Sequence, residues 1–176
     1  SAAAADIEIY AEDGDWIENR FLATLQDANG VKRVFGRRAV FDVEAGCDAV
    51  QTVKCVDVIS YDAFDLEALK KDGILERNCD LDKVISGNAA FVISDEAIQK
   101  GGVVSVFGTQ VTVAGKLKFD PLSSDGSTEG RTTLIVSDET FRNITGISDY
   151  TMLLVQLSDS ATDENIDTLK TLTGER

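Results

Sequence analysis

Apolar and polar residues follow two spacings along the chain, and these predict short strands mixed with short helices. Alternation with a period of two, or a short unbroken apolar run, is typical of a strand. Recurrence every three or four residues is typical of one face of a helix. Strands are predicted over residues 6–10, 31–45 with a bulge at Gly36, 53–60, 89–93, 132–136 and 151–157, and a strand pair that bends or turns at Gly115 is predicted before Phe119.

Capping residues set the predicted helix boundaries. A side-chain oxygen ahead of the first turn accepts free amide protons, and glycine after the last turn takes up the left-handed backbone that ends a helix. Asp15, with Glu18 three residues later, predicts a helix that ends at Asn29-Gly30. Further helices are predicted over residues 62–71, from Ser94 to Gly101, from Ser137 to Ile144, and from Ser160 or Thr162 to Gly174, whereas residues 74–85 are predicted to be irregular.

Strand–helix units stand at both ends of the chain, and a strand-rich stretch lies between them. We therefore predict an α+β fold with two lobes. One is a β-α-β lobe built from both chain ends, residues 6–44 and 130–176, and the other is an inserted β-rich lobe, residues 45–129. Residues 92–98 (VISDEAI) and 135–141 (IVSDETF) also match each other. Two copies are too few for a repeat protein, and a shared strand–cap–helix structure explains the match.

The length of 176 residues suits one domain or two small lobes, and the net charge of −14 limits the partners. Nucleic acid is excluded, because phosphate contacts need clustered Lys and Arg, and so is adsorption to an anionic membrane surface. An acidic surface keeps a protein soluble, and the alternative use is a basic partner. No apolar run reaches the ~20 residues of a membrane-spanning helix. The opening Ser1–Ala5 lacks the charged region and apolar core of a signal peptide.

The chain has no histidine and three cysteines, which limits the chemistry it can perform. Nucleophile systems that rely on histidine are excluded, and the commonest zinc ligand is missing. Cys47 and Cys55 flank a predicted turn. They either form a disulfide across a hairpin or are, with Cys79, small half-buried thiols. The chain has no Cys-x-x-Cys spacing, so neither a thioredoxin-type redox site nor a zinc ribbon is indicated.

Lys32, Arg33, Arg37 and Arg38 form the one basic cluster in the sequence. We interpret it as a solvated strand face, with a specific anion site as the alternative. No glycine-rich phosphate-binding loop accompanies the cluster, which favours the first interpretation.

The remaining candidate groups are also explained by structure. The segment 12–15 (EDGD) lacks the ligand spacing of a calcium loop and is interpreted as helix capping. Trp16 is placed in a first helical turn as a core or lobe contact, with a ligand platform as the alternative. Ser94 and Ser137 are interpreted as caps, since no base is suggested near either. We therefore predict no catalytic, cofactor-binding or metal-binding residue.

Five segments, taken in order, resemble one protein family. Their order and spacing over about 140 residues are similar to the extracytoplasmic domain of ABC-transporter permeases of the MacB/FtsX/LolC-E type. The segments are Asn29–Val34 (NGVKRV), Val56–Phe64 (VDVISYDAF), Ala90–Gly115 with Gly108 and Gly115 in two late glycine places, Leu134–Ile144, and Met152–Leu169. Two departures stand out. Lys116–Phe119 lacks the valine-glycine ending common in the family, and the family's last strand would fall beyond Arg176.

The resemblance implies a porter-like lobe, a smaller β-rich lobe and no catalysis in this segment. It implies a place on the extracytoplasmic face of the cell membrane, extracellular or periplasmic, between two transmembrane helices of a parent permease. The expected partners are those helices, a separate ATP-binding subunit or domain, and an exported substrate or extracytoplasmic protein. The permease is expected to be dimeric and the isolated domain monomeric. Apolar helices are expected in the parent reading frame directly before residue 1 and after residue 176.

Two other classes of function are compatible with the sequence. The first is a stand-alone adhesion or ligand-binding module of a cell surface, which predicts a signal peptide and sorting or repeat segments in the parent gene. The second is a hydrolase that relies on carboxylates alone, which predicts an acidic pocket. A glycosidase would need such a pocket lined with aromatic side chains, and the chain holds a single tryptophan.

Overall fold

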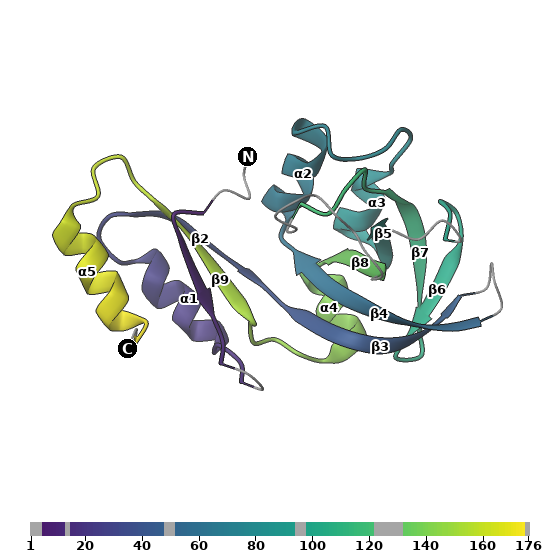
Figure 1. Cartoon of the computed structure of the whole chain (residues 1–176), viewed down its shortest axis with the longest axis horizontal. Coiled ribbons are helices and arrows are strands. Elements are labelled where there is room, and N and C mark those ends of the chain that lie inside the picture. The colour runs from purple at the N-terminus through teal and green to yellow at the C-terminus, as the bar shows by residue number, and fades with distance from the viewer. Residues whose placement is uncertain (1–4, 13–14, 48–51, 94–97, 122–131, 175–176) are drawn as a thin grey trace. The chain divides into compact units, whose positions relative to one another are not determined.

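The computed structural model describes residues 5–12, 15–47, 52–93, 98–121 and 132–174. The chain divides into two compact units: the terminal unit, Ala4–Arg37 with Ser148–Arg176, and the barrel unit, Arg38–Ile147. In Figure 1 the purple and yellow elements from the two chain ends share the terminal unit. The α+β fold with two lobes, one of them built from both chain ends, is confirmed. No helix among the described residues has the length and apolar character needed to cross a membrane.

The terminal unit is a three-stranded antiparallel sheet with two helices. The strands β1 (Ile7–Tyr10), β9 (Met152–Leu157) and β2 (Val31–Arg37) lie in the order β1-β9-β2. The helices are α1 (Asn19–Gln26) and α5 (Asp163–Leu172). Leu25 of α1 and Leu169 of α5 are buried in one core with residues of the sheet. Because β9 lies between β1 and β2, the sheet needs both ends of the chain.

The barrel unit is a closed barrel of six strands in the order β3-β4-β8-β5-β7-β6. Strands β4 and β8 run parallel, as do β5 and β7, and the other neighbours are antiparallel. Its strands and helices are β3 (Ala39–Cys47), β4 (Thr52–Tyr61), α2 (Ala63–Lys71), α3 (Leu81–Ser86), β5 (Ala89–Ile93), β6 (Val103–Val106), β7 (Thr109–Lys116), β8 (Thr132–Ser137) and α4 (Asp138–Thr145).

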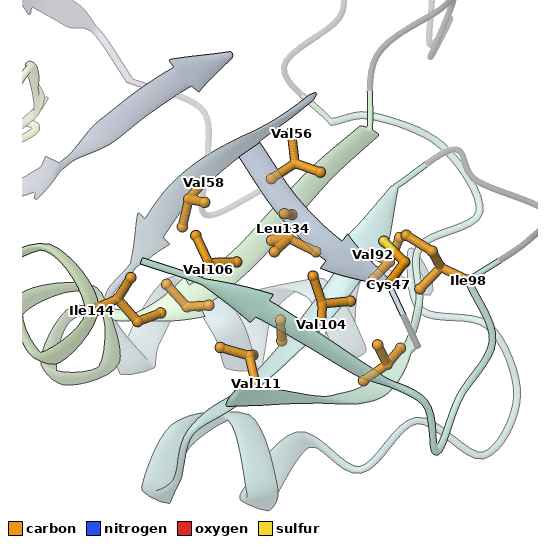
Figure 2. Close-up of a cluster of buried hydrophobic side chains, with 14 of the residues drawn as sticks. Cys47, Val56, Val58, Val92, Ile98, Val104, Val106, Val111, Leu134 and Ile144 are labelled. Atoms are coloured by element: carbon orange, nitrogen blue, oxygen red, sulfur yellow. The ribbon is translucent and has the colours of Figure 1, made fainter. Parts of the chain in front are cut away.

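Two apolar cores stabilise the barrel unit, one on each face of its strands. The first gathers side chains from all six strands together with Phe141 and Ile144 of α4, as Figure 2 shows in part. The second packs the other strand face against α2 and α3, through residues such as Leu66 and Val84. All five residues of β5 are buried, because the strand has a core on both sides. This explains why residues 89–93 are an unbroken apolar run rather than an alternating one.

Local caps fix most helix ends as predicted. The Ser137 Oγ atom accepts the Thr140 amide at the start of α4, and Gly146 ends that helix with φ of 72°. Thr162 caps α5 in a reciprocal capping box with Asn165. The predicted helix start at Ser94 lies outside the described residues. Helix α3 was not predicted, although the Asp80 side chain caps it by accepting the Lys83 amide.

The predicted capping role of Asp15 is wrong. Helix α1 begins at Asn19, because Ile17 and Tyr150 exchange backbone hydrogen bonds of 2.7 and 2.8 Å that keep the preceding segment extended. The Asn19 amide donates instead to Asp149 Oδ1 at 3.1 Å. A long-range bridge thus overrides the local capping signal.

The single strand predicted over residues 31–45 is two strands in two different sheets. Strand β2 ends at Arg37 and β3 begins at Ala39. The irregularity in β3 falls between Val40 and Val43 rather than at Gly36. Gly36 instead permits close packing, since a Cβ atom there would lie 2.3 Å from the Tyr150 ring.

Gly108 and Gly115 have separate roles. The turn of the last strand pair is at Phe107-Gly108, which joins β6 to β7. Gly115 lies inside β7 with φ of 154°, and a Cβ atom there would lie 2.2 Å from Cys79 Sγ. The pairing of β5 with β7 is irregular beside it. Gly115 is therefore the predicted strand bend and not the hairpin turn.

The two units have boundaries that differ from the predicted lobes. Residues 38–44 and 130–147 were assigned to the lobe of the chain ends, but they belong to the barrel unit. The reason is strand pairing: β3 pairs with β4 from Ala39 onward, and β8 pairs with β4 from Thr132 to Ser137. These strands are therefore part of the barrel wall.

Substituting Gly36 with alanine is expected to destabilise the protein by about 1–3 kcal/mol, because the added methyl group overlaps the buried Tyr150 ring. Chemical denaturation of the purified chain measures the change. Gly46→Ala is the matched control, since a Cβ atom there meets only Ser105 at an ordinary 3.7 Å. Equal effects of the two substitutions would contradict the packing role of Gly36.

Candidate functional site

The carboxylates considered as metal ligands are not gathered into a metal site. Among the residues that the structure describes, no three His, Cys, Asp or Glu side chains come together in a group suited to a metal ion. Asp13 and Gly14 lie outside those residues. The Asp15 amide donates to the Glu12 carbonyl oxygen at 2.9 Å, ahead of α1.

The structure places Trp16 and Ser137, two of the residues considered as candidates. Trp16 is in the extended segment ahead of α1 and is 39% exposed, so its placement in a first helical turn and in the core is wrong. Ser137 is buried, and its hydroxyl donates to Thr140 Oγ1 while accepting the Thr140 amide. Both hydrogen-bonding functions of Ser137 are thus used in capping α4. Ser94 lies outside the described residues.

The cysteines do not form the hypothesised disulfide. Strand register places Cys47 opposite Thr52 and Cys55 opposite Glu44. This offset of three positions puts the two side chains on opposite faces of the strand pair, with Cys47 buried and Cys55 exposed. Cys79 is half-buried, and burial raises the pKa of its thiol. Cys55 is therefore the most accessible thiol among the described residues.

The interpretation of the basic cluster as a solvated strand face is wrong for two of its four members. Arg37 and Arg38 are each only 1% exposed, where the chain passes from β2 to β3. The Arg33 guanidinium stacks over the Phe35 ring at 4.2 Å from its centroid. Of the four, Lys32 alone is exposed.

Arg38 is the centre of a buried polar network in the barrel unit. Its Nη1 atom lies 3.1 Å from Asp138 Oδ1, at the first residue of α4. Its amide donates to Ser60 Oγ at 2.9 Å, and the Ser60 amide donates to the Arg38 carbonyl oxygen at 2.8 Å. The network therefore joins the start of β3 to β4 and to the start of α4.

Burial raises the pKa of Asp138 above its ordinary value, although Arg38 lies beside it. Asp62, which caps α2, raises the pKa further by repulsion. Arg38, a hydrogen bond from Ser60 and Arg142 act in the opposite direction. The loss of hydration at this carboxylate thus exceeds the stabilisation from its two arginines.

The charges of this network have a structural use. A buried guanidinium needs a partner, because an isolated buried charge destabilises a protein by several kcal/mol. Asp138 supplies that partner from the positive end of the α4 dipole. No sequence spacing links positions 38 and 138. The sequence held one signal that these arginines are buried: they stand inside an apolar stretch (VFGRRAVF), where a charged side chain is expected to be paired.

An open groove of about 530 Å³ follows β1 in the terminal unit. It is lined by Ile7 and Ile9 of β1, by Leu25, Val155 and Leu169, and by polar residues that include Asp6, Glu8, Glu12 and Lys170. Among the described strands, only β9 pairs with β1, so the second edge of β1 is open there. Tyr10, which also lines the groove, donates to the Glu8 carboxylate, and this hydrogen bond raises the Tyr10 pKa. Such an edge offers backbone donors and acceptors to a further strand.

No family model matches the sequence. No curated protein matches it either. The informative comparison is therefore with solved structures.

Three solved domains share the fold over nearly the whole chain. The extracellular domain of the ABC-type transporter YknZ from Gram-positive bacteria has a TM-score of 0.61 at 16% identity, covering 94% of this chain and 86% of that one. The periplasmic region of MacB from Actinobacillus actinomycetemcomitans has a TM-score of 0.63 at 15% identity, covering 95% and 83%. A domain of a permease protein from Porphyromonas gingivalis has a TM-score of 0.57 at 13% identity, covering 96% and 78%.

These similarities confirm the predicted resemblance at the level of the fold. The order of short motifs pointed to permease domains of the MacB type, and domains of ABC-type transporters and of a permease share this architecture. Because each covers more than nine-tenths of this chain, the likeness includes both units.

Replacing Asp138 with asparagine is expected to change how stability depends on pH. The raised pKa means that the folded chain binds this proton more tightly than the unfolded chain, whose ordinary value is 3.8. The free energy of unfolding of the wild type should therefore rise relative to that of D138N as the pH falls from neutral toward 3.8. The stability gained from this proton should be lost again as the pH rises through the raised pKa.

Denaturant unfolding of both proteins across this pH range measures the difference. Glu139→Gln is the matched control, because it removes an exposed carboxylate from the same turn of α4. A stability of wild type relative to D138N that stays constant with pH, or that falls on acidification, would contradict the raised pKa.

Proposed function

We propose that this chain is the extracytoplasmic domain of an ABC-transporter permease of the MacB/FtsX/LolC-E type. The observation that supports this most is the common architecture of the chain and three transporter or permease domains, which includes a lobe made from both chain ends. On this proposal the domain lies outside the cytoplasmic membrane, facing the cell exterior or the periplasm.

The proposed role is mechanical and not catalytic. ATP would be hydrolysed by a separate cytoplasmic subunit or domain, and the resulting movement would reach an exported substrate or a partner protein through this domain. The topology supports such a role, because within the described residues the chain passes between the terminal unit and the barrel unit at Arg37-Arg38 and at Ile147-Ser148. Force on either chain end thus passes through the terminal sheet before it reaches the barrel unit.

The groups that might have suggested an enzyme have structural uses that support this proposal. Ser137 caps α4, and Asp138 neutralises Arg38. The expected assembly is a dimeric permease that carries two such domains, with the isolated domain monomeric. A stand-alone adhesion or ligand-binding module is the alternative. It would have the same location but no attachment to transmembrane helices.

The location can be tested through Cys55. In cells that express the parent protein, a membrane-impermeant maleimide is expected to label this exposed thiol without disruption of the cytoplasmic membrane. If the cells have an outer membrane, spheroplasts are used instead of intact cells, so that the reagent reaches the outer face of the cytoplasmic membrane. A Cys55→Ser variant is the matched control and should lose this label, since Cys47 is buried and the pKa of the Cys79 thiol is raised. Labelling that requires permeabilised cells would place the chain in the cytoplasm and contradict the proposal.

The attachment is tested on the same labelled sample. After extraction with alkaline carbonate, a permease should remain in the membrane fraction, because its transmembrane helices hold it there. Release of the labelled protein into the supernatant would contradict the permease and favour the stand-alone module.

A further inference from the structure

Two exposed phenylalanines lie on the outer wall of the barrel unit around β3. Phe41 in β3 is 61% exposed, and Phe107 in the turn after β6 is 55% exposed. Strand β6 pairs antiparallel with β3 from Ala45 to Cys47, and its last residue, Val106, lies opposite Ala45. The turn that holds Phe107 therefore begins where β3 reaches Glu44. Cys55 of β4 lies opposite Glu44 on the other side. We call Phe41, Glu44, Cys55 and Phe107 the β3 patch.

The exposure of Phe41 results from an irregularity in β3. The pairing with β4 shifts between Val40 and Val43, so that Phe41 and Asp42 bulge out of the ladder. Asp42 has φ of 54°, and its amide donates at 3.1 Å to Oδ1 of the buried Asp57. Val40 and Val43 both pack on the barrel core. The bulge therefore keeps two valines inside while it turns the large aromatic side chain out to solvent.

Phe107 is in a backbone conformation that does not suit it. The two-residue turn between β6 and β7 has φ of 49° at Phe107 and 76° at Gly108. Turns with two positive φ values favour Asn-Gly, and a bulky residue in this region costs about 1–2 kcal/mol. The side chain is exposed, so burial does not offset this cost. A use outside the folding of the chain would account for both aromatic residues.

Glu44 supplies a negative charge in the same part of β3. Its side chain is exposed, and within the described part of the chain no other side chain forms an ion pair or hydrogen bond with its carboxylate. Asp42, also exposed, adds a second carboxylate beside Phe41. Aromatic rings around a carboxylate match a cation that has apolar neighbours, because the cation is attracted both to the charge and to the ring faces.

We propose that the β3 patch is a docking surface for a protein segment in which lysine or arginine is flanked by apolar side chains. The cation would pair with Glu44, and its apolar neighbours would cover Phe41 and Phe107. This deepens the proposed function, on which it rests for the location of the partner outside the membrane. A second copy of this chain fits less well, since the net charge of −14 and the exposed Asp42 and Glu44 repel an identical surface.

The test uses the 176-residue chain and two synthetic peptides. One is a capped Gly-Leu-Lys-Phe-Arg-Leu-Gly, and the other has glutamate in place of both cations. Amide chemical-shift changes on titration give the affinity and the position of binding. The basic peptide is expected to shift residues of β3, β4 and the Phe107 turn, and the acidic peptide is expected to leave them unshifted.

Three variants localise the interaction. Phe41→Ser, Glu44→Gln and Phe107→Asn should each weaken binding of the basic peptide at least about tenfold, as expected for central contacts of an interface. Phe64→Ser removes a 51% exposed phenylalanine from α2 and is the matched control. Phe107→Asn should also raise the melting temperature, because asparagine suits the positive φ. Its loss of binding can then not be caused by unfolding.

Several results would overturn the proposal. These are no saturable shift up to millimolar basic peptide, equal binding of the acidic peptide, an effect of Phe64→Ser as large as that of the patch variants, or self-association that the patch variants abolish. The last result would assign the patch to a second copy. Because the test uses the isolated chain, it can fail while Cys55 labelling still supports the permease.

Discussion

The pairing of Arg38 with Asp138 is the interaction on which the barrel unit depends where the chain enters it. A guanidinium that is 1% exposed needs a charged partner close by, so the first residue of α4 must lie beside the start of β3. Ser60 adds backbone and hydroxyl contacts from β4 to the same point. Residues near the two ends of the barrel sequence are thereby held together, and the six strands close into a barrel without a free sheet edge.

Sequence reasoning succeeded where cause and effect lie within about four residues. Ser137, Gly146 and Thr162 set helix ends through hydrogen bonds to their own neighbours. The first two were predicted, and Thr162 was one of two predicted caps. Sequence reasoning failed where a distant residue decides the outcome. Asp15 is a good cap, but the bridge from Ile17 to Tyr150 moves the helix start to Asn19. Arg37 and Arg38 have the composition of a surface cluster, yet they are buried. The exposure of Phe41 depends on the register of β3 against β4, which the local pattern does not contain.

At 13–16% identity, the likeness to the permease domains is one of fold. Gly108 and Gly115, the two late glycines of the motif, have φ of 76° and 154° in the structure. Gly115 also leaves no space for a Cβ atom next to Cys79. Such positions are restricted by backbone geometry, whereas core positions accept any apolar side chain of suitable volume. A shared architecture can therefore persist when most side chains differ.

The position of β9 in the middle of the terminal sheet has a consequence for the order in which the chain folds. During synthesis Ile7 emerges early, but its partner in the sheet is Val155, and the Asn19 amide awaits Asp149. The N-terminal segment therefore has no sheet to join until the whole barrel unit has been made. The barrel sequence Arg38–Ile147 is contiguous and contains all of its own strand partners. Folding would begin in the middle of the chain, with the apolar N-terminal strand exposed in the meantime to chaperones and to proteases.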